Sequence, residues 1–158
     1  MAHTASLPEI KQTLPFRSRA QEASVALLLT ADRLRRTISA LTDTYEITAQ
    51  QYNVLRILRG SKAEGLATLE IAARMIEQTP GITRLLDRLE SRELVRRERC
   101  STDRRQVLCW ITAKGLRLLE DLDQPVDRAD KRALRMLSTA EMAALLRILK
   151  KIRQGLSD

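Results

Sequence analysis

The side chains that could bind or react are concentrated in the middle of the chain, and most of them are arginines. Residues 96–105 contain five arginines and two carboxylates, so this segment has a net charge of +3. The arginines are Arg96, Arg97, Arg99, Arg104 and Arg105, and the carboxylates are Glu98 and Asp103. Guanidinium groups bind phosphates and can hydrogen-bond to guanine through two donors at once. The pattern therefore favours binding of a polyanion over bond-making chemistry.

Side chains suited to catalysis are scarce. His3 is the sole histidine, which excludes a histidine-based triad, a histidine metal cluster and imidazole acid–base catalysis. The sequence has no glycine-rich phosphate loop. Four aspartates near Pro125 lack a glycine at a loop centre and indicate a solvated helix face rather than a calcium site: Asp121, Asp123, Asp127 and Asp130. We therefore expect no enzyme activity, no metal and no cofactor.

Cys100 carries a redox hypothesis. It lies between Arg99 and Ser101, which could lower the pKa of its thiol and make it a redox switch. The alternative is an unreactive cysteine that is merely tolerated. We expect Cys109 to lie in the core of a strand. Two cysteines placed this unevenly form neither a disulfide framework nor a CxxC site, which agrees with a reducing compartment.

Length and charge set broader limits. The chain of 158 residues has 28 Lys and Arg against 20 Asp and Glu, a net charge of +8 and a pI near 10.2. Such a charge makes polyanions the first partners to test, although solubility alone is the alternative. The opening residues lack the apolar region of a signal peptide, and no segment approaches the ~18 apolar residues of a membrane helix. We expect one globular domain, with or without an interaction arm, in the cytoplasm and away from membranes.

Residues 79–90 are predicted to form a helix with two different faces. Thr79 can cap this helix, and Pro80 can occupy its first position, because proline lacks only an N–H that would be unpaired there. The apolar positions are Ile82, Leu85, Leu86 and Leu89, whereas Thr79, Thr83, Arg84, Asp87 and Arg88 point elsewhere. The polar face could contact a partner. The alternative is a solvated face whose arginines pair with Asp87 and Glu90.

The segments before this helix are predicted to be helical. A long helix from about Ser18 to Thr44 has a heptad-like apolar seam at Leu27, Ala31, Leu34, Ile38, Leu41 and Tyr45. A capping box at Thr48 to Gln51 begins the next helix, which Gly60 ends. Residues 61–67 are predicted to be a loop, Thr68 the cap of a short helix from Leu69 to Met75, and Glu77 and Gln78 a turn.

The segments after it are predicted to be a two-stranded hairpin and two helices. The runs LVRRER and QVLCWI form the strands, and Trp110 covers the junction with neighbouring helices. Thr112 caps a helix that Pro125 kinks or breaks. A capping box at Ser138 to Glu141 begins the last helix, whose seam is Met142, Leu145, Leu149, Ile152 and Leu156. Two matching seams suggest a partner chain, although either could instead be an intramolecular core.

The order of elements resembles the MarR family of bacterial winged-helix transcription regulators, over roughly residues 18–156. The run TPGITRLLDRLESRELVRRER is similar to that family's recognition helix and first wing strand. Asp103 to Arg105, followed by Ile111 to Gly115, is similar to its wing tip and strand-to-helix junction. Glu93 departs from the pattern, because the family usually has glycine in this turn; a strained or differently built turn is expected. The expected fold is mainly α with a small β-hairpin wing: a winged helix-turn-helix with N- and C-terminal dimerisation helices.

The resemblance implies three parts: residues 1–46 as an arm and dimerisation helix, 47–112 as the DNA-binding domain, and 113–158 as dimerisation helices. The expected function is sequence-specific binding of double-stranded DNA by a homodimer, as a ligand-responsive repressor on a pseudopalindromic operator. The expected ligand is a small aromatic or phenolic molecule. The expected DNA-binding residues are Thr79, Gly81, Thr83, Arg84, Arg88, Arg99, Asp103, Arg104 and Arg105. The alternative is a winged-helix module that binds an acidic protein and has no sequence-specific DNA binding.

Overall fold

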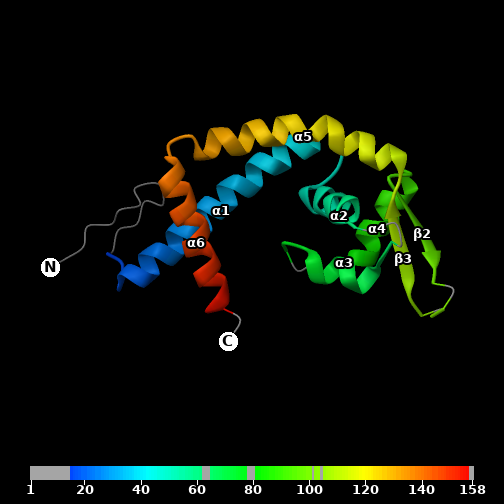
Figure 1. Ribbon diagram of the computed structural model, residues 1–158, viewed down its shortest axis with the longest axis horizontal. Coiled ribbons are helices and arrows are strands. Elements are labelled where there is room, and N and C mark those ends of the chain that lie inside the picture. Colours follow the sequence, from blue (N-terminus) through cyan, green and yellow to red (C-terminus); the bar gives the residue numbers. More distant parts are fainter. Residues whose placement is uncertain (1–14, 62–64, 78–80, 101, 104, 157–158) are drawn as a thin grey trace.

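The computed structural model describes residues 15–61, 65–77, 81–100, 102–103 and 105–156. Its elements in chain order are α1 (Arg19–Asp43), α2 (Ala49–Arg59), β1 (Leu66–Ala67), α3 (Thr68–Arg74), α4 (Ile82–Ser91), β2 (Val95–Arg99), β3 (Val107–Ile111), α5 (Ala113–Leu134) and α6 (Thr139–Gln154). Helix α5 spans the molecule, with α2, α3, α4 and the sheet below one end and α6 below the other (Figure 1). Helix α1 runs beneath α5 from the α6 end towards the sheet (Figure 1). The predicted mainly α fold with a small β wing is confirmed.

Side-chain caps begin three helices where the sequence predicts them. Thr48 and Gln51 form a reciprocal capping box at the start of α2, with N···O distances of 3.1 and 2.9 Å. Ser138 and Glu141 form the second capping box, at the start of α6. Thr112 caps α5 through its hydroxyl oxygen. Each cap satisfies a backbone N–H that has no partner inside the helix, so the boundaries are local properties of the sequence.

Two predicted helix starts are wrong. Helix α3 begins at Thr68 rather than Leu69, and its N-cap, Ala67, provides no side-chain hydrogen bond. Helix α4 begins at Ile82, and Gly81 is its N-cap with φ of 117°. This left-handed backbone conformation is not helical, so α4 does not extend back through Gly81 to Pro80. Thr79 and Pro80 themselves lie outside the described residues.

The sheet has three strands rather than the predicted two. Its order is β1-β3-β2, and both pairings are antiparallel. Strand β1 pairs Leu66 with Cys109 and Ala67 with Leu108, within the segment predicted to be a loop. Two residues are too few to show the alternation that identifies a strand in a sequence. The third strand therefore arises from its pairing with β3.

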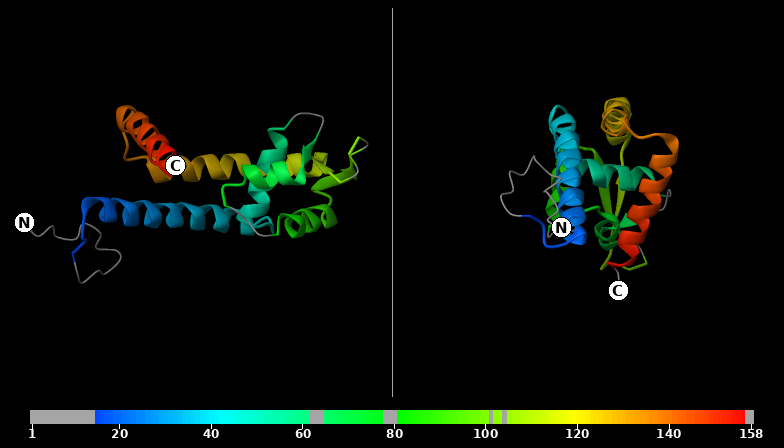
Figure 2. Two further views of the ribbon diagram at one scale, coloured as in Figure 1. Left: turned by 90° about the horizontal axis from the view of Figure 1, so that it is seen from below. Right: turned by 90° about the vertical axis from the view of Figure 1, so that its left-hand side faces the viewer.

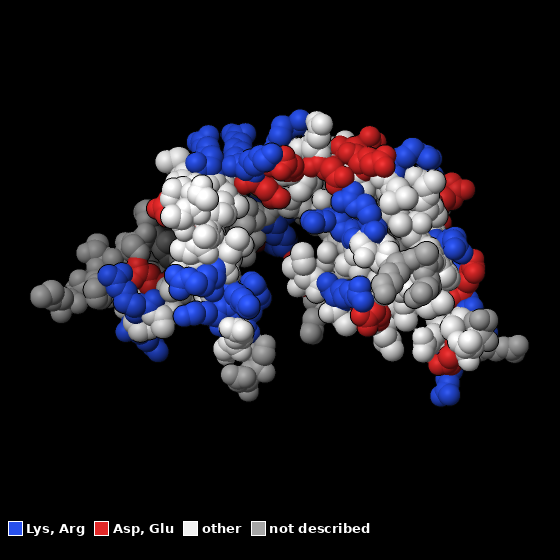
Figure 3. Space-filling model, viewed as in Figure 1, with Lys and Arg blue, Asp and Glu red and all other residues white. Residues whose placement is uncertain are grey.

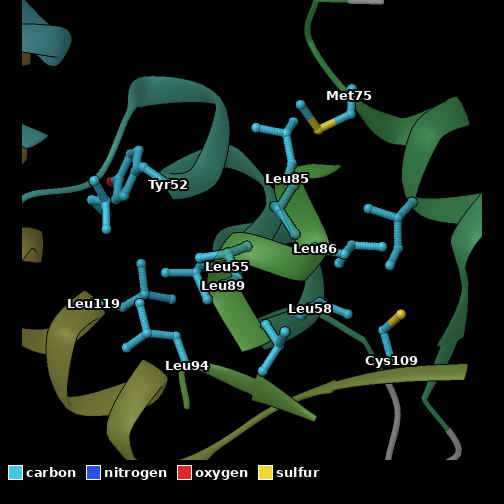
Figure 4. Packing of buried hydrophobic residues seen from close by; sticks show 14 of the residues in the cluster. Tyr52, Leu55, Leu58, Met75, Leu85, Leu86, Leu89, Leu94, Cys109 and Leu119 are labelled. Carbon is cyan, nitrogen blue, oxygen red and sulfur yellow. The ribbon is translucent and has the colours of Figure 1, made fainter. Parts of the chain in front are cut away.

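One hydrophobic core connects α2, α3, α4, the sheet and the first half of α5 (Figure 4). Its fully buried side chains include Leu55, Leu58, Ile71, Leu86, Leu89, Cys109, Leu119 and Leu122. The predicted core position of Cys109 is confirmed. The last turns of α1 pack on the edge of this core through Ile38 and Leu41, and Tyr45 packs there from the turn that follows α1. The core therefore fixes α4 against a rigid support.

Helix α5 is continuous through Pro125, so the predicted break does not occur, and the kink remains a prediction. Proline has no N–H and leaves the carbonyl four residues earlier without its helical donor. That carbonyl belongs to Asp121, and it accepts a hydrogen bond from the Tyr45 hydroxyl at 3.3 Å. A side chain from the end of α1 thus replaces the missing donor.

The apolar seams at the two ends of the chain remain exposed in part. In α1, Leu27 and Leu28 are 37% and 70% exposed, in contrast to the packed end of the same helix. None of the residues of α6 is buried, and α6 makes no extensive contact with any other described element. Figure 2 shows α6 separated from α1 in both views. No helix in the described ranges is long and apolar enough to cross a membrane.

Candidate nucleic-acid interface

Helix α4 has a buried apolar face and an exposed polar face. Leu85, Leu86 and Leu89 are buried in the core. Gly81, Thr83, Arg84 and Arg88 are exposed, as the sequence predicts for the surface that contacts a partner. A Cβ atom added at Gly81 would meet nothing within 4 Å, so glycine is required there by its positive φ and not by crowding. The start of α4 is therefore open to an approaching ligand.

The carboxylates beside this face are neutralised by Arg97 of β2. Arg97 Nη2 lies 2.6 Å from Asp87 Oδ1 and 2.6 Å from Glu90 Oε2, and Arg97 Nε donates to Glu90 at 2.9 Å. These hydrogen bonds, led by the one to Glu90, raise the pKa of Arg97 above its ordinary value. The alternative, in which arginines of α4 pair with these carboxylates, is not what the structure has. No described carboxylate pairs with Arg84 or Arg88.

The turn before α4 is held by polar contacts from α1 and α2. The Ile76 N–H donates to Asn53 Oδ1 at 3.0 Å. Glu77 accepts a hydrogen bond from Gln50 Nε2 at 3.3 Å and lies 3.8 Å from Arg35 Nε of α1. The other predicted turn residue, Gln78, lies outside the described residues. These contacts place α4 after α3 in a helix-turn-helix arrangement.

The wing, which is the β2–β3 hairpin (residues 95–111), stands beside α4. The Arg96 guanidinium lies over the Trp110 ring, 4.1 Å from its centroid, and pairs with Glu98. A Cβ at Gly65 would lie 2.5 Å from Trp110 Cε2, so Trp110 packs on the backbone beside β1. The packing of Trp110 against neighbouring helices remains a prediction. Its contacts with Gly65 and Arg96 lie within the winged part of the chain.

The tip of the wing is basic and ordered around Asp103. Its carboxylate accepts from the Arg105 N–H at 3.0 Å and from Gln106 Nε2 at 3.2 Å. Asp103 Oδ1 also lies 3.7 Å from Arg105 Nε, and the Arg105 side chain is 96% exposed. Arg99 is exposed at the end of β2, and Arg104 lies outside the described residues. Figure 3 shows basic side chains protruding at the tip of this hairpin.

Cys100 follows β2 and has a perturbed thiol. Hydrogen bonding to Thr102 Oγ1, at an S···O distance of 3.1 Å, and to the backbone of Asp103 and Thr102 lowers the pKa of Cys100. The direction agrees with the sequence hypothesis, but the cause is hydrogen bonding rather than the Arg99 charge. Ser101 lies outside the described residues. Burial raises the pKa of the Cys109 thiol, so the pKa values of the two cysteines are shifted in opposite directions.

Glu93, in the turn between α4 and β2, has a left-handed backbone. Glu93 has φ of 60°, the Glu93 N–H donates to the Glu90 carbonyl, and the Leu94 N–H donates to the Leu89 carbonyl. These two bonds form a Schellman motif, in which glycine is the usual left-handed residue. Thr112 Oγ1 donates to the Glu93 carbonyl at 2.7 Å. The expected strain at Glu93 is thus confirmed as a left-handed backbone.

The sequence does not reveal the roles of three residues that shape the interface. Its pattern places Arg97 in the basic wing, but in the structure Arg97 neutralises carboxylates of α4. Arg92 contacts the junction of α1 and α2, and Gly65 packs on Trp110. No pattern within a single helix or strand shows these pairings, because each joins residues of different segments.

This arrangement of two helices, a turn and a basic hairpin defines a winged helix-turn-helix protein. The MarR family model matches residues 47–107. The chain is 43% identical to a MarR transcription factor from Planctomyces limnophilus, over 85% of this chain and 98% of that one, with a TM-score of 0.66. The chain therefore belongs to the MarR family, whose members are transcriptional regulators and not enzymes.

Two further relatives have lower identity. The transcriptional regulator HosA of Escherichia coli is 27% identical over 107 residues, which are 68% of this chain and 78% of HosA. A cysteine-to-serine mutant of MarR from E. coli, solved in complex with operator DNA, is 27% identical, with a TM-score of 0.73. That match covers 82% of this chain and 91% of the MarR mutant.

Proposed function

We propose that this regulator binds double-stranded DNA sequence-specifically, with α4 in the major groove. The exposed face of α4 carries the proposal, because Arg84 and Arg88 lie there opposite a buried face and no described carboxylate pairs with them. A recognition helix contacts base edges with its N-terminal residues. Arg84 is suited to a bidentate contact with guanine, and Arg88, one turn later, to base or phosphate.

The remaining contacts of α4 follow from the backbone at its start. Gly81 and Thr83 lie at the first turn, where N–H groups and the helix dipole favour phosphate. Thr79 remains an expected contact at the same end of the helix. Similarity to a MarR mutant solved with operator DNA supports this mode of binding.

The wing supplies contacts of a different kind. Arg105 is almost fully exposed at the hairpin tip, and Asp103 restricts its position. A guanidinium placed in this way can enter a narrow A·T-rich minor groove, where the negative potential is concentrated. Arg99 and Arg104 are assigned to phosphates, which fix position rather than sequence. Arg96 and Arg97 have internal partners and are not assigned to DNA.

The functional unit is a homodimer in which residues 1–46 and 113–158 join two DNA-binding domains (residues 47–112). The uncovered apolar surfaces of α1 and α6 support this assembly. A twofold axis would place two recognition helices about one DNA turn apart, ~34 Å, so the operator is a pseudopalindrome.

Repression that responds to a ligand completes the proposal. A groove of about 1110 Å³ lies between α1 and α5, lined by apolar residues such as Leu41 and Met136 and by arginines including Arg128 and Arg132. Such a lining suits a small aromatic or phenolic acid, whose ring the apolar groups would contact and whose carboxylate the arginines would pair with. Binding there would change the separation of the two DNA-binding domains.

The test is selection of duplexes from a random pool by the full-length protein in the presence of competitor DNA. We expect a pseudopalindromic consensus that is retained as salt increases. A winged-helix module that binds acidic proteins would enrich no sequence, and its DNA binding would fall steeply with salt. For the ligand, thermal unfolding with hydroxybenzoates should show stabilisation that uncharged phenols of equal size do not give. Equal responses would exclude the arginine-lined groove as the site.

A further inference from the structure

Arg92, the residue after α4, connects the recognition helix to the junction of α1 and α2. Its Nη1 donates to the carbonyl of Glu46, and its Nη2 donates to the carbonyl of Tyr45 at 3.3 Å. Its Nη2 also lies 3.7 Å from the exposed carboxylate of Glu46. The planar guanidinium therefore holds two successive carbonyls through two different nitrogen atoms, which fixes direction as well as distance.

The two carbonyls are available because of the way α1 ends. The Ile47 N–H donates back to the Thr42 carbonyl at 3.2 Å, and Glu46 has φ of 58°. This left-handed reversal turns the chain away from the helix. Tyr45 and Glu46 lie in the reversal, beyond the last residue of α1, so their carbonyls take no part in its helical hydrogen bonds. Arg92 supplies donors to both carbonyls.

Tyr45 extends the connection to α5. Its hydroxyl donates to the Asp121 carbonyl, which lacks a helical donor because residue 125 is proline. One continuous set of contacts thus runs from the end of α4, through the reversal after α1, to the middle of α5. Both α1 and α5 belong to the proposed dimerisation region.

The beginning of α4 is also connected to α1. Glu77, in the turn before α4, lies 3.8 Å from Arg35 Nε of α1 and accepts a hydrogen bond from Gln50 of α2. A contact at one end alone would leave α4 able to swing about it. Contacts at both ends restrict its angle to α1.

We propose that Arg92 and Tyr45 are positioning residues that fix the angle between the recognition helix and the dimerisation helices, and thereby the half-site spacing that the dimer accepts. The inference rests on the proposed function, because only in a dimer on DNA does this angle become a distance between two recognition helices. Neither side chain needs to touch DNA. Their loss should broaden the tolerated spacing and leave the preferred base sequence unchanged.

The test measures affinity for the duplex selected above and for duplexes whose half-sites are one or two base pairs closer or farther apart. The variants are Arg92→Ala, Arg92→Lys and Tyr45→Phe in the full-length protein. Arg92→Lys keeps the positive charge but loses the two-pronged donor, so it separates geometry from charge. Lys131→Ala is the matched control, because it removes one positive charge and one ion pair, to Asp127, within α5 alone.

We expect Arg92→Ala to reduce the preference for the parent spacing by roughly fivefold, the scale of a lost hydrogen bond. Arg92→Lys should lose most of the same preference, Tyr45→Phe less, and Lys131→Ala none. The inference is overturned if Arg92→Ala and Arg92→Lys weaken binding to a single half-site and to every spacing by one common factor, or if they retain the parent preference. A parent protein that selects no sequence at all would overturn the proposed function and this inference with it.

Discussion

The winged part of the molecule (α2 to β3) and its helical arm (α1, the second half of α5 and α6) differ in how far their apolar side chains are buried. In the winged part, α2, α3, α4 and the sheet bury their apolar side chains against each other and against α5 within one chain. In the arm, α6 has no buried residue, and Leu146 and Ile148 are 62% and 47% exposed. Burial of apolar surface is the main stabilising term in folding. The winged part therefore obtains this stabilisation within one chain, whereas α6 does not; in the proposed homodimer a second chain would supply it.

Helix α1 shows this difference along its own length. Its last turns pack on the winged core through Ile38 and Leu41, and its first half leaves Leu27 and Leu28 exposed. One regular seam in the sequence thus packs on the core at one end of α1 and is exposed at the other. The contacts of Arg92 and Tyr45 lie where the two parts meet.

The largest expected effect is the difference in alkylation rate between the two cysteines, which tests whether the core of the winged part is closed. Cys109 is buried in the central strand of the sheet and should react with iodoacetamide only when the domain opens, whereas Cys100 is partly exposed. Opening a core costs about the global free energy of unfolding, so the two alkylation rates should differ by at least ~10³-fold. Mass spectrometry of the labelled native protein measures both rates. Comparable rates would mean that the core is not closed.

The same experiment tests the lowered pKa of Cys100. The hydrogen bond from Thr102 is the largest cause of that shift and stabilises the thiolate. In Thr102→Ala the pKa should rise, so the pH at which alkylation reaches half its maximal rate should move upward. An unchanged pH profile would remove the basis for the redox hypothesis at Cys100.

Removal of a core side chain should produce the largest loss of stability. Leu86 is fully buried, so Leu86→Ala should lower the free energy of unfolding by about 3 kcal/mol through lost contacts and a residual cavity. Urea denaturation measures the change. Leu69→Ala is the control, because Leu69 of α3 is 82% exposed and its truncation should change stability by less than about 0.5 kcal/mol.

A charge in the uncovered seam of the arm should disrupt assembly rather than folding. We expect the parent to be a dimer at micromolar concentration by light scattering. Ile152→Asp should raise the dissociation constant of the dimer by roughly 30-fold, the effect of a well-packed interface residue. Arg147→Asp places the same side chain on the opposite face of α6 and should leave the dimer intact. A monomeric parent would show that the arm has another use.

Substitutions on the DNA-facing surface should separate specificity from affinity. Arg84→Ala should lose about 2 kcal/mol of discrimination at one base pair, because it removes a bidentate base contact. Arg105→Ala should mainly weaken binding to A·T-rich flanks. Arg147→Ala, on the exposed face of α6, is the control for loss of an exposed arginine. If Arg84→Ala and Arg105→Ala bind every duplex as the parent does, the assigned surface is wrong.

The smallest expected effect concerns the turn after the recognition helix. Glu93→Gly should stabilise the protein by about 1 kcal/mol, because glycine adopts the left-handed conformation without steric cost. Glu93→Ala loses the Lys114 ion pair but keeps the strained conformation, and it should give no gain. A Gly variant less stable than the Ala variant would contradict this account. Chemical denaturation of both variants decides the question.

Much of the fold was predictable because its signals are local. Capping boxes at Thr48 and Ser138 and the apolar spacing of α4 involve residues three or four apart, which a helix brings together regardless of its surroundings. The predicted start of α4 is wrong because Thr79 and Pro80 match an ordinary capping pattern in the sequence, whereas Gly81 adopts a non-helical φ. Strand β1 was missed because two residues carry no period of their own.

The sequence alone identifies the arginines of the candidate interface, but it does not show which of them are neutralised by carboxylates and which are not. Composition and periodicity place Arg84, Arg88, Arg97 and Arg105 on polar positions. Only the folded chain brings Arg97 against Asp87 and Glu90, and leaves Arg84 and Arg88 without a described carboxylate partner.

The sequence by itself thus determined the helices, the wing and the family, because periodicity, caps and motifs act over a few residues. The tertiary structure decided which charges are neutralised, how Tyr45 replaces the donor missing at Pro125, and how Arg92 connects α4 to α1. These pairings join residues of different elements, from 7 positions apart for Arg97 and Glu90 to 76 for Tyr45 and Asp121. They depend on the relative placement of whole elements, which the packing of the core establishes.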